Sequence, residues 1–90
     1  MDKEKFILQM FRKHRNDALR SLDLSWARQH FPNADDETLL ISLHKARYVC
    51  TDIEPHMRHA SAEWLRARNL HDLYGLDLLP PGELPHGAKE

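Results

Sequence analysis

The fold is decided by residues 35–69, which read DDETLLISLHKARYVCTDIEPHMRHASAEWLRARN. Two amphipathic stretches flank the segment Thr51-Asp52-Ile53-Glu54-Pro55. A proline suits the first turn of a helix, because its missing N–H would have no partner there in any case. The pattern therefore predicts one helix over residues 35–50, a hinge at 51–55, and a second helix over residues 54–69.

Each of these helices has a predicted apolar stripe and a predicted end. The first is expected to begin at an Asn33 cap and to bury the side chains that recur at helical spacing, Leu39, Leu43, Ala46 and Cys50. The second is expected to end at Asn69 in the left-handed conformation. Its predicted inward face consists of Met57, Ala60, Trp64 and Leu65.

The N-terminal part of the chain predicts two further helices, over residues 2–21 and 24–31, the second stopped by Pro32. In the longer one, apolar residues recur at helical spacing and are expected to be core: Phe6, Ile7, Met10, Phe11, Ala18 and Leu19. The opposite face is expected to be solvated and is basic: Lys3, Lys5, Arg12, Lys13 and Arg15.

The expected architecture is all-α, a small single domain of about four helices in an orthogonal or bundle-like array. It should span residues 1–79, with 70–79 as a short docking segment. Several prolines and glycines after residue 79 exclude a regular helix there, so residues 80–90 are predicted to form an extended, flexible tail.

Composition excludes several classes of protein. No apolar run exceeds three residues, so no segment is expected to span a bilayer. Cys50 is the only cysteine, so no internal disulfide is possible and a cytoplasmic location is the simplest expectation. The formal net charge of −1 lacks the basic excess of a dedicated nucleic-acid domain, although residues 1–21 and 43–71 are locally basic.

No motif in the chain predicts catalysis, a metal site or a cofactor. The three glycines form no phosphate-binding loop. His56 and His59 lie three positions apart, but a closed zinc site needs four ligands and no Cys-x-x-Cys pair completes one. Cys50 lies on an apolar stripe and is expected to be a buried small side chain rather than a nucleophile. The predicted function is therefore non-enzymatic.

The basic second helix of the pair has two functional interpretations. The preferred one is protein binding, through Arg58, Glu63, Arg66 and Arg68 with Trp64 beside them, since Trp and Arg dominate interface energetics. The alternative is a helix-turn-helix-like DNA-binding regulator, in which the second helix enters the major groove. The nucleic-acid contacts would then be His56, Arg58 and His59 at base edges and Lys45 and Arg47 at phosphates. A homodimer is compatible with either.

The chain also resembles small accessory proteins of temperate phages and prophages of enteric bacteria over roughly residues 26–84. The resemblance rests on Leu43-His44-Lys45-Ala46-Arg47-Tyr48, Thr51-Asp52-Ile53, Arg58, Ser61 and Glu63-Trp64-Leu65. It implies a bacterial cytoplasm and a regulatory or inhibitory role, exerted by binding a host or phage protein. No catalytic motif accompanies it.

Overall fold

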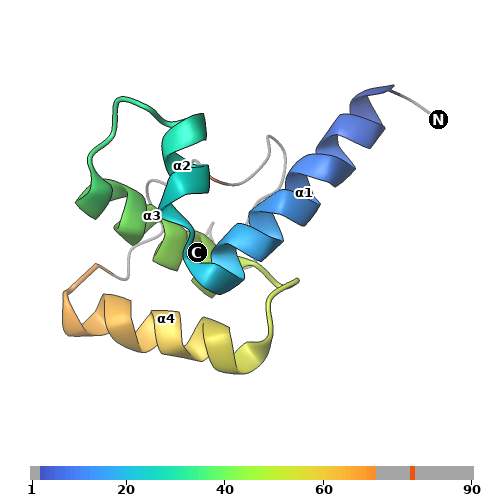
Figure 1. Cartoon of the computed structure of the whole chain (residues 1–90). Coiled ribbons are helices and arrows are strands. Elements are labelled where there is room, and N and C mark those ends of the chain that lie inside the picture. Colours follow the sequence, from blue (N-terminus) through green and yellow to red (C-terminus); the bar gives the residue numbers. More distant parts are fainter. Residues whose placement is uncertain (1–2, 71–77, 79–90) are drawn as a thin grey trace.

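The computed structural model describes residues 3–70 and Leu78, and the chain in this part forms four helices and no strand. The helices are α1 (Lys3–Ser21), α2 (Leu24–His30), α3 (Asp36–Val49) and α4 (Pro55–Ala67), as labelled in Figure 1. The all-α class is confirmed, and each helix lies where the sequence predicted it. Within the described ranges, no helix is long and apolar enough to cross a membrane.

The central element is α3, which packs against each of the other three helices. Its predicted stripe is confirmed as buried and forms most of the core together with residues from the other elements. The buried core cluster comprises Leu19, Ala27, Leu39, Leu43, Ala46, Cys50, Ile53 and Leu78. Met57 packs against this cluster from α4, whereas Ala60 is exposed and was wrongly placed on the inward face.

The start of α3 differs from its prediction. The N-cap is Asp35 rather than Asn33, because the Asp35 carboxylate accepts a hydrogen bond from the Thr38 backbone N–H at 2.8 Å. A carboxylate at this position satisfies an N–H that the helix leaves unpaired and interacts favourably with the helix dipole. Hydrogen bonding from Thr38, chiefly through its side chain and also through this backbone N–H, lowers the pKa of Asp35.

The end of α4 is as predicted. Asn69 has φ 57°, in the left-handed region that asparagine tolerates better than most residues. The Leu70 N–H donates to the Leu65 carbonyl at 2.8 Å, and the Asn69 N–H donates to the Arg66 carbonyl at 3.1 Å. These paired bonds form a Schellman motif, which stops the helix and turns the chain away from it.

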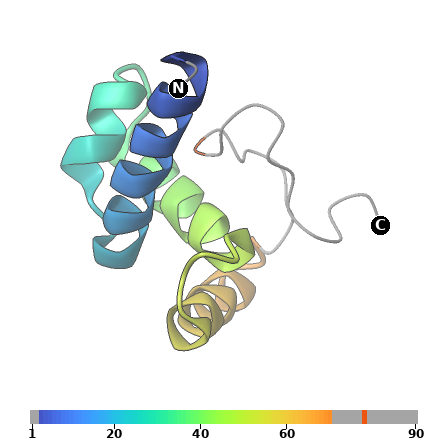
Figure 2. The same cartoon turned by 90° about the vertical axis from the view of Figure 1, so that its right-hand side faces the viewer.

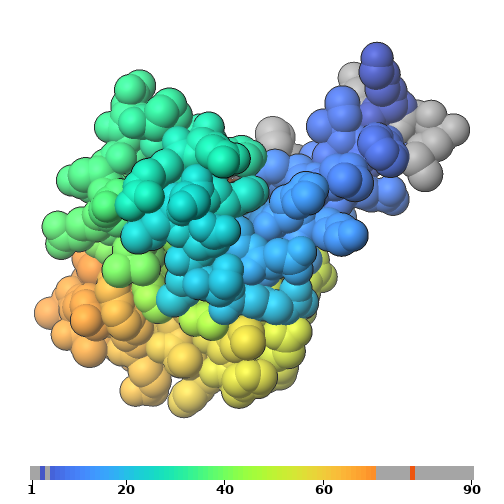
Figure 3. Space-filling view, viewed as in Figure 1, coloured from blue at the N-terminus to red at the C-terminus, as the bar shows by residue number. Residues whose placement is uncertain are grey.

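The first half of α1 is not part of the core, and this corrects the sequence prediction. Phe6 is 52% exposed, Ile7 59%, Leu8 38% and Met10 40%. The N-terminal turns of α1 project beyond the body of the molecule, as Figures 1 and 3 show. Figure 2 shows α4 at the opposite end of the molecule from these turns. The second half of α1, by contrast, buries Ala18 and Leu19.

Arg15 was expected in solvent, but its side chain is completely buried. Its guanidinium donates to the Asn16 Oδ1 at 2.9 Å and lies 3.5 Å from the Cys50 Sγ and 3.6 Å from an Asp52 carboxylate oxygen. A buried cation needs such partners to offset the loss of its hydration. Arg15 therefore joins α1 to the hinge that precedes α4.

The predicted C-terminal docking segment and tail lie mostly outside the described residues. This applies to residues 71–77, to 79, and to the whole tail at 80–90. Leu78 is described and is 1% exposed, within the core cluster. It lines a small cavity together with residues of α3 and of the loop before it, including Phe31 and Leu39.

Candidate interaction surface

The face of α4 that the sequence singled out is only partly available for a partner. His56, His59, Glu63, Arg66 and Arg68 are exposed, whereas Trp64 and Arg58 are half-buried. The His59 imidazole lies 3.7 Å from the Glu63 carboxylate, an ion pair only when the histidine is protonated. The exposed residues thus mix histidines, one acid and arginines rather than forming a purely basic stripe.

Two of the three arginines on this face are engaged within the protein. The Arg58 Nε donates to the Tyr48 carbonyl at 3.2 Å. The Arg68 guanidinium lies 4.0 Å from the centroid of the Trp64 ring and also donates to the Trp64 carbonyl at 3.1 Å. Of the three, only Arg66 has a side chain with no hydrogen bond or ion pair to another described residue. The expected free guanidinium groups are therefore reduced to one.

Trp64 is occupied by an internal stack. Its ring lies parallel to the His44 imidazole, with centroids 4.0 Å apart and planes 13° from parallel. The His44 Nδ1 and the Ser61 Oγ share a hydrogen bond of 3.0 Å. Burial above all, together with the nearby positive charges of Arg47 and Arg68, lowers the pKa of His44 from 6.5 to about 4. The stack ties α3 to α4 around a neutral imidazole.

The two predicted phosphate contacts are not placed for that role. Lys45 is only 8% exposed. Arg47 donates to the Arg20 carbonyl at 3.1 Å, its Nε is buried without a hydrogen bond, and burial lowers its pKa. A cation reaches a DNA phosphate only from an exposed position. Of the predicted nucleic-acid residues, His56 and His59 alone are exposed.

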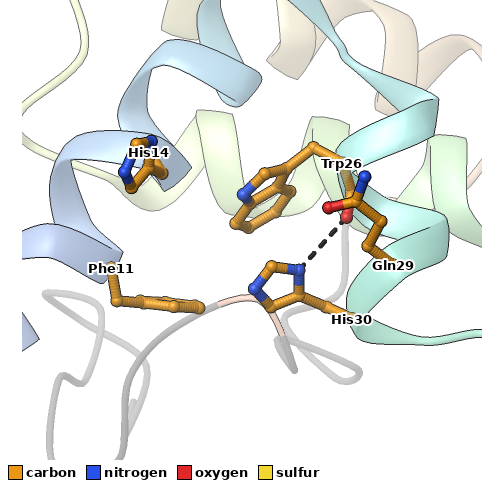
Figure 4. A pocket seen from close by; sticks show the side chains of 5 residues that line it. All are labelled: Phe11, His14, Trp26, Gln29 and His30. Atoms are coloured by element: carbon orange, nitrogen blue, oxygen red, sulfur yellow. Dashed lines mark hydrogen bonds between the residues drawn. The ribbon is translucent and has the colours of Figure 1, made fainter. Parts of the chain in front are cut away.

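A second surface, which sequence reasoning missed, lies between α1 and α2. It is an open pocket of about 280 Å³ whose walls come from both helices: Phe11, His14, Trp26, Gln29 and His30. Figure 4 shows the Phe11, Trp26 and His30 rings grouped around it. The Trp26 and His30 ring centroids are 4.5 Å apart, and Phe11 lies 5.9 Å from Trp26 and 5.7 Å from His30.

The shape of this pocket is maintained by backbone and ring contacts. The His30 Nδ1 is 3.2 Å from the Trp26 carbonyl oxygen, the bond drawn in Figure 4. The Asp23 carboxylate caps α2 by accepting from the Trp26 N–H at 3.2 Å. Both interactions stabilise the short helix α2, and the ring contacts of Phe11 with Trp26 and His30 join it to α1.

The exposed part of α1 continues directly from this pocket. Ile7 precedes Phe11, and Met10 precedes His14, by four positions each, which places each pair on the same side of the helix. Phe6 lies next to Met10 on this surface. We call residues 3–14 of α1 the arm, and Phe6, Ile7 and Met10 its apolar face. Arm and pocket together form one surface.

The sequence did contain a signal for this surface. A helix rises about 1.5 Å per residue, so the 19 residues of α1 extend roughly 28 Å, whereas the 7 residues of α2 extend roughly 10 Å. A helix as short as α2 cannot cover the whole length of α1. Periodicity shows which side of a helix is apolar, but it does not show how much of its length is covered.

No group of three or more histidine, cysteine or acidic side chains within residues 3–70 is arranged to hold a metal ion. Comparison with known proteins found no matching family model, no similar curated protein and no similar solved structure.

Proposed function

We propose that this chain is a non-enzymatic regulatory protein that acts by binding another protein through the arm and the adjoining pocket. The observation that carries the proposal is the exposure of Phe6, Ile7 and Met10 in continuity with an aromatic pocket. With side chains of about 200 Å² each, the exposed apolar patch is on the order of 300 Å², within the range of patches that are often functional.

Contact of this apolar patch with water is unfavourable in free energy, and binding a partner would remove that contact. Apolar surface contributes about 25 cal/mol per Å² when it is buried, so covering the arm favours association by several kcal/mol before entropy losses. The same residues add little to the stability of the isolated domain, because they contact little of it. Their value to the protein is therefore best explained by a partner.

The pocket supports recognition better than catalysis. It is lined by three ring systems, one further histidine and one amide, and these residues include no carboxylate, thiol or hydroxyl that an imidazole could activate. Its open shape suits the insertion of a side chain from a partner. The resemblance to small phage and prophage proteins supports a regulatory or inhibitory role inside a bacterial host, with a host or phage protein as the partner.

DNA binding through α4 is the alternative, favoured by the exposure of His56, His59 and Arg66 at one end of the molecule. The engagement of Arg58 and the burial of Lys45 weigh against it. Binding to duplex DNA would fall steeply with salt, because each phosphate contact releases counterions.

Protein binding through the arm and DNA binding through α4 are distinguished by two assays, an affinity capture from bacterial lysate and a salt-titrated DNA mobility-shift assay. The wild-type chain, Ile7→Glu and the matched control Arg66→Glu are immobilised at equal density after circular dichroism has verified their helicity. We expect the wild type and Arg66→Glu to retain one protein that Ile7→Glu loses. A strong, salt-sensitive DNA shift that Arg66→Glu abolishes, with no arm-dependent capture, would show the alternative to be correct.

A further inference from the structure

The charges around the arm restrict what can cover it. Lys3, Lys5 and Lys13 are all exposed. A residue advances 100° around a helix, so Lys3 falls on the same side as Met10, and Lys13 on the same side as Phe6. This corrects the expectation that both lysines lie on the face opposite to the apolar residues. The apolar face is thus bordered by a lysine at each end.

The size and shape of the site indicate that the segment of the partner that binds there is a helix. The arm is 12 residues long, about 18 Å or three turns, and Lys3 and Lys13 lie about 15 Å apart along its axis. The arm projects from the body, so its pocket side forms a concave corner with α2 (Figure 3). A partner α-helix fits such a concave corner. A flat bilayer would contact only the outer edges of the corner.

A second copy of this chain is a poor occupant. If two arms paired in an antiparallel manner, Lys3 of each would face Lys13 of the other. If they paired in parallel, each lysine would face its own equivalent. Like charges in direct opposition destabilise a helix pair in both orientations. A partner with carboxylates at these two places gains attraction instead.

We propose that the occupant is an acidic amphipathic helix of another protein. Its apolar ridge lies on Phe6, Ile7 and Met10, one large side chain enters the Phe11/Trp26/His30 pocket, and carboxylates about ten residues apart meet Lys3 and Lys13. This inference rests on the proposed function, because it takes the arm to be the binding surface, and it adds the chemistry of the partner.

A charge-swap experiment tests the inference. The probes are an 18-residue fluorescent helical peptide with leucines at i, i+3 and i+7 and flanking glutamates, and a twin in which every glutamate is lysine. Fluorescence anisotropy measures their binding to the wild type, to Lys3→Glu/Lys13→Glu and to Arg66→Glu. The substituted positions are exposed, so we expect all variants to fold.

The expected result is a reversal of preference. The wild type and Arg66→Glu bind the acidic peptide, and the double variant binds it about tenfold more weakly, as expected for two exposed pairs turned from attraction to repulsion. The double variant in turn prefers the lysine twin. Equal binding of both peptides, or no binding of the acidic one, overturns the inference. So does dimerisation of the wild type, or its binding to phosphatidylserine vesicles in preference to the acidic peptide.

The same variants separate this inference from the proposed function. Capture from lysate that is lost in Ile7→Glu but kept in Lys3→Glu/Lys13→Glu would leave the arm as the binding surface and exclude an acidic partner. Capture that is insensitive to Ile7→Glu would exclude both. Capture lost in both variants, and retained by Arg66→Glu, supports both.

Discussion

Replacement of His44 by phenylalanine should remove a specific part of the pH dependence of stability. In the folded protein the pKa of His44 is lowered to about 4, from 6.5 for the free side chain, chiefly by burial against Trp64. Phenylalanine keeps a ring on Trp64 but cannot be protonated. It also leaves the Ser61 hydroxyl without its imidazole partner, a loss that does not depend on pH.

The sign and size of this pH-dependent change in stability follow from the folded and unfolded pKa values of His44. Between pH 6.5 and 4 the unfolded chain protonates His44 and the folded protein does not, so protons favour the unfolded state and stability falls as the pH falls. The loss attributable to His44 is small at pH 7, about 2 kcal/mol at pH 5, and about 3 kcal/mol once the pH is below both values.

Urea denaturation followed by circular dichroism at pH 7 and pH 5 measures this effect. The wild type should lose about 2 kcal/mol more than His44→Phe between the two pH values. Other groups titrate equally in both proteins and cancel in the comparison. Gln29→Ala, at an exposed residue that does not titrate, is the control and should keep the wild-type pH dependence. Parallel losses in the wild type and His44→Phe would refute a buried, neutral imidazole.

Three further changes test how the fold is held together, each by urea denaturation. Arg15→Ala should destabilise the protein by about 3 kcal/mol, because it empties a buried site and removes a guanidinium that donates to the Asn16 Oδ1. A loss no larger than that for the exposed Arg28→Ala would contradict this. Asn69→Val should cost about 1 to 2 kcal/mol at its left-handed position, whereas Asn69→Gly should be nearly neutral; equal effects would argue against the Schellman motif. Leu78→Ala should cost about 3 kcal/mol if Leu78 fills the core, and an unchanged midpoint would place it outside.

Local signals in the sequence were sufficient for the positions of all four helices. Pro55 and Asn69 act within a turn of their own positions, so their effects can be recognised without knowing the tertiary structure. The stripe from Leu39 to Cys50 was also recognised correctly, because α3 is surrounded and every part of its apolar side is covered. Asn33 was misassigned as a cap because Asp35 is an equally good capping residue two positions later.

The candidate site was harder to predict because it depends on which elements meet. Arg15 carries a charge that normally indicates solvent, yet the hinge before α4 closes over it. Phe6 and Ile7 have the periodicity of core residues, yet no described element covers them. Arg58 is half-buried because tertiary packing brings the Tyr48 carbonyl of α3 to it, whereas Trp64 precedes Arg68 by only four positions along α4.

The most direct test of the arm as the binding surface is an amide chemical-shift titration of the ¹⁵N-labelled chain with the partner retained on capture. We expect the largest shifts to fall in residues 5–14 and 26–30, with residues 56–66 little changed. Shifts concentrated in α4, with the arm and the pocket unaffected, would contradict it.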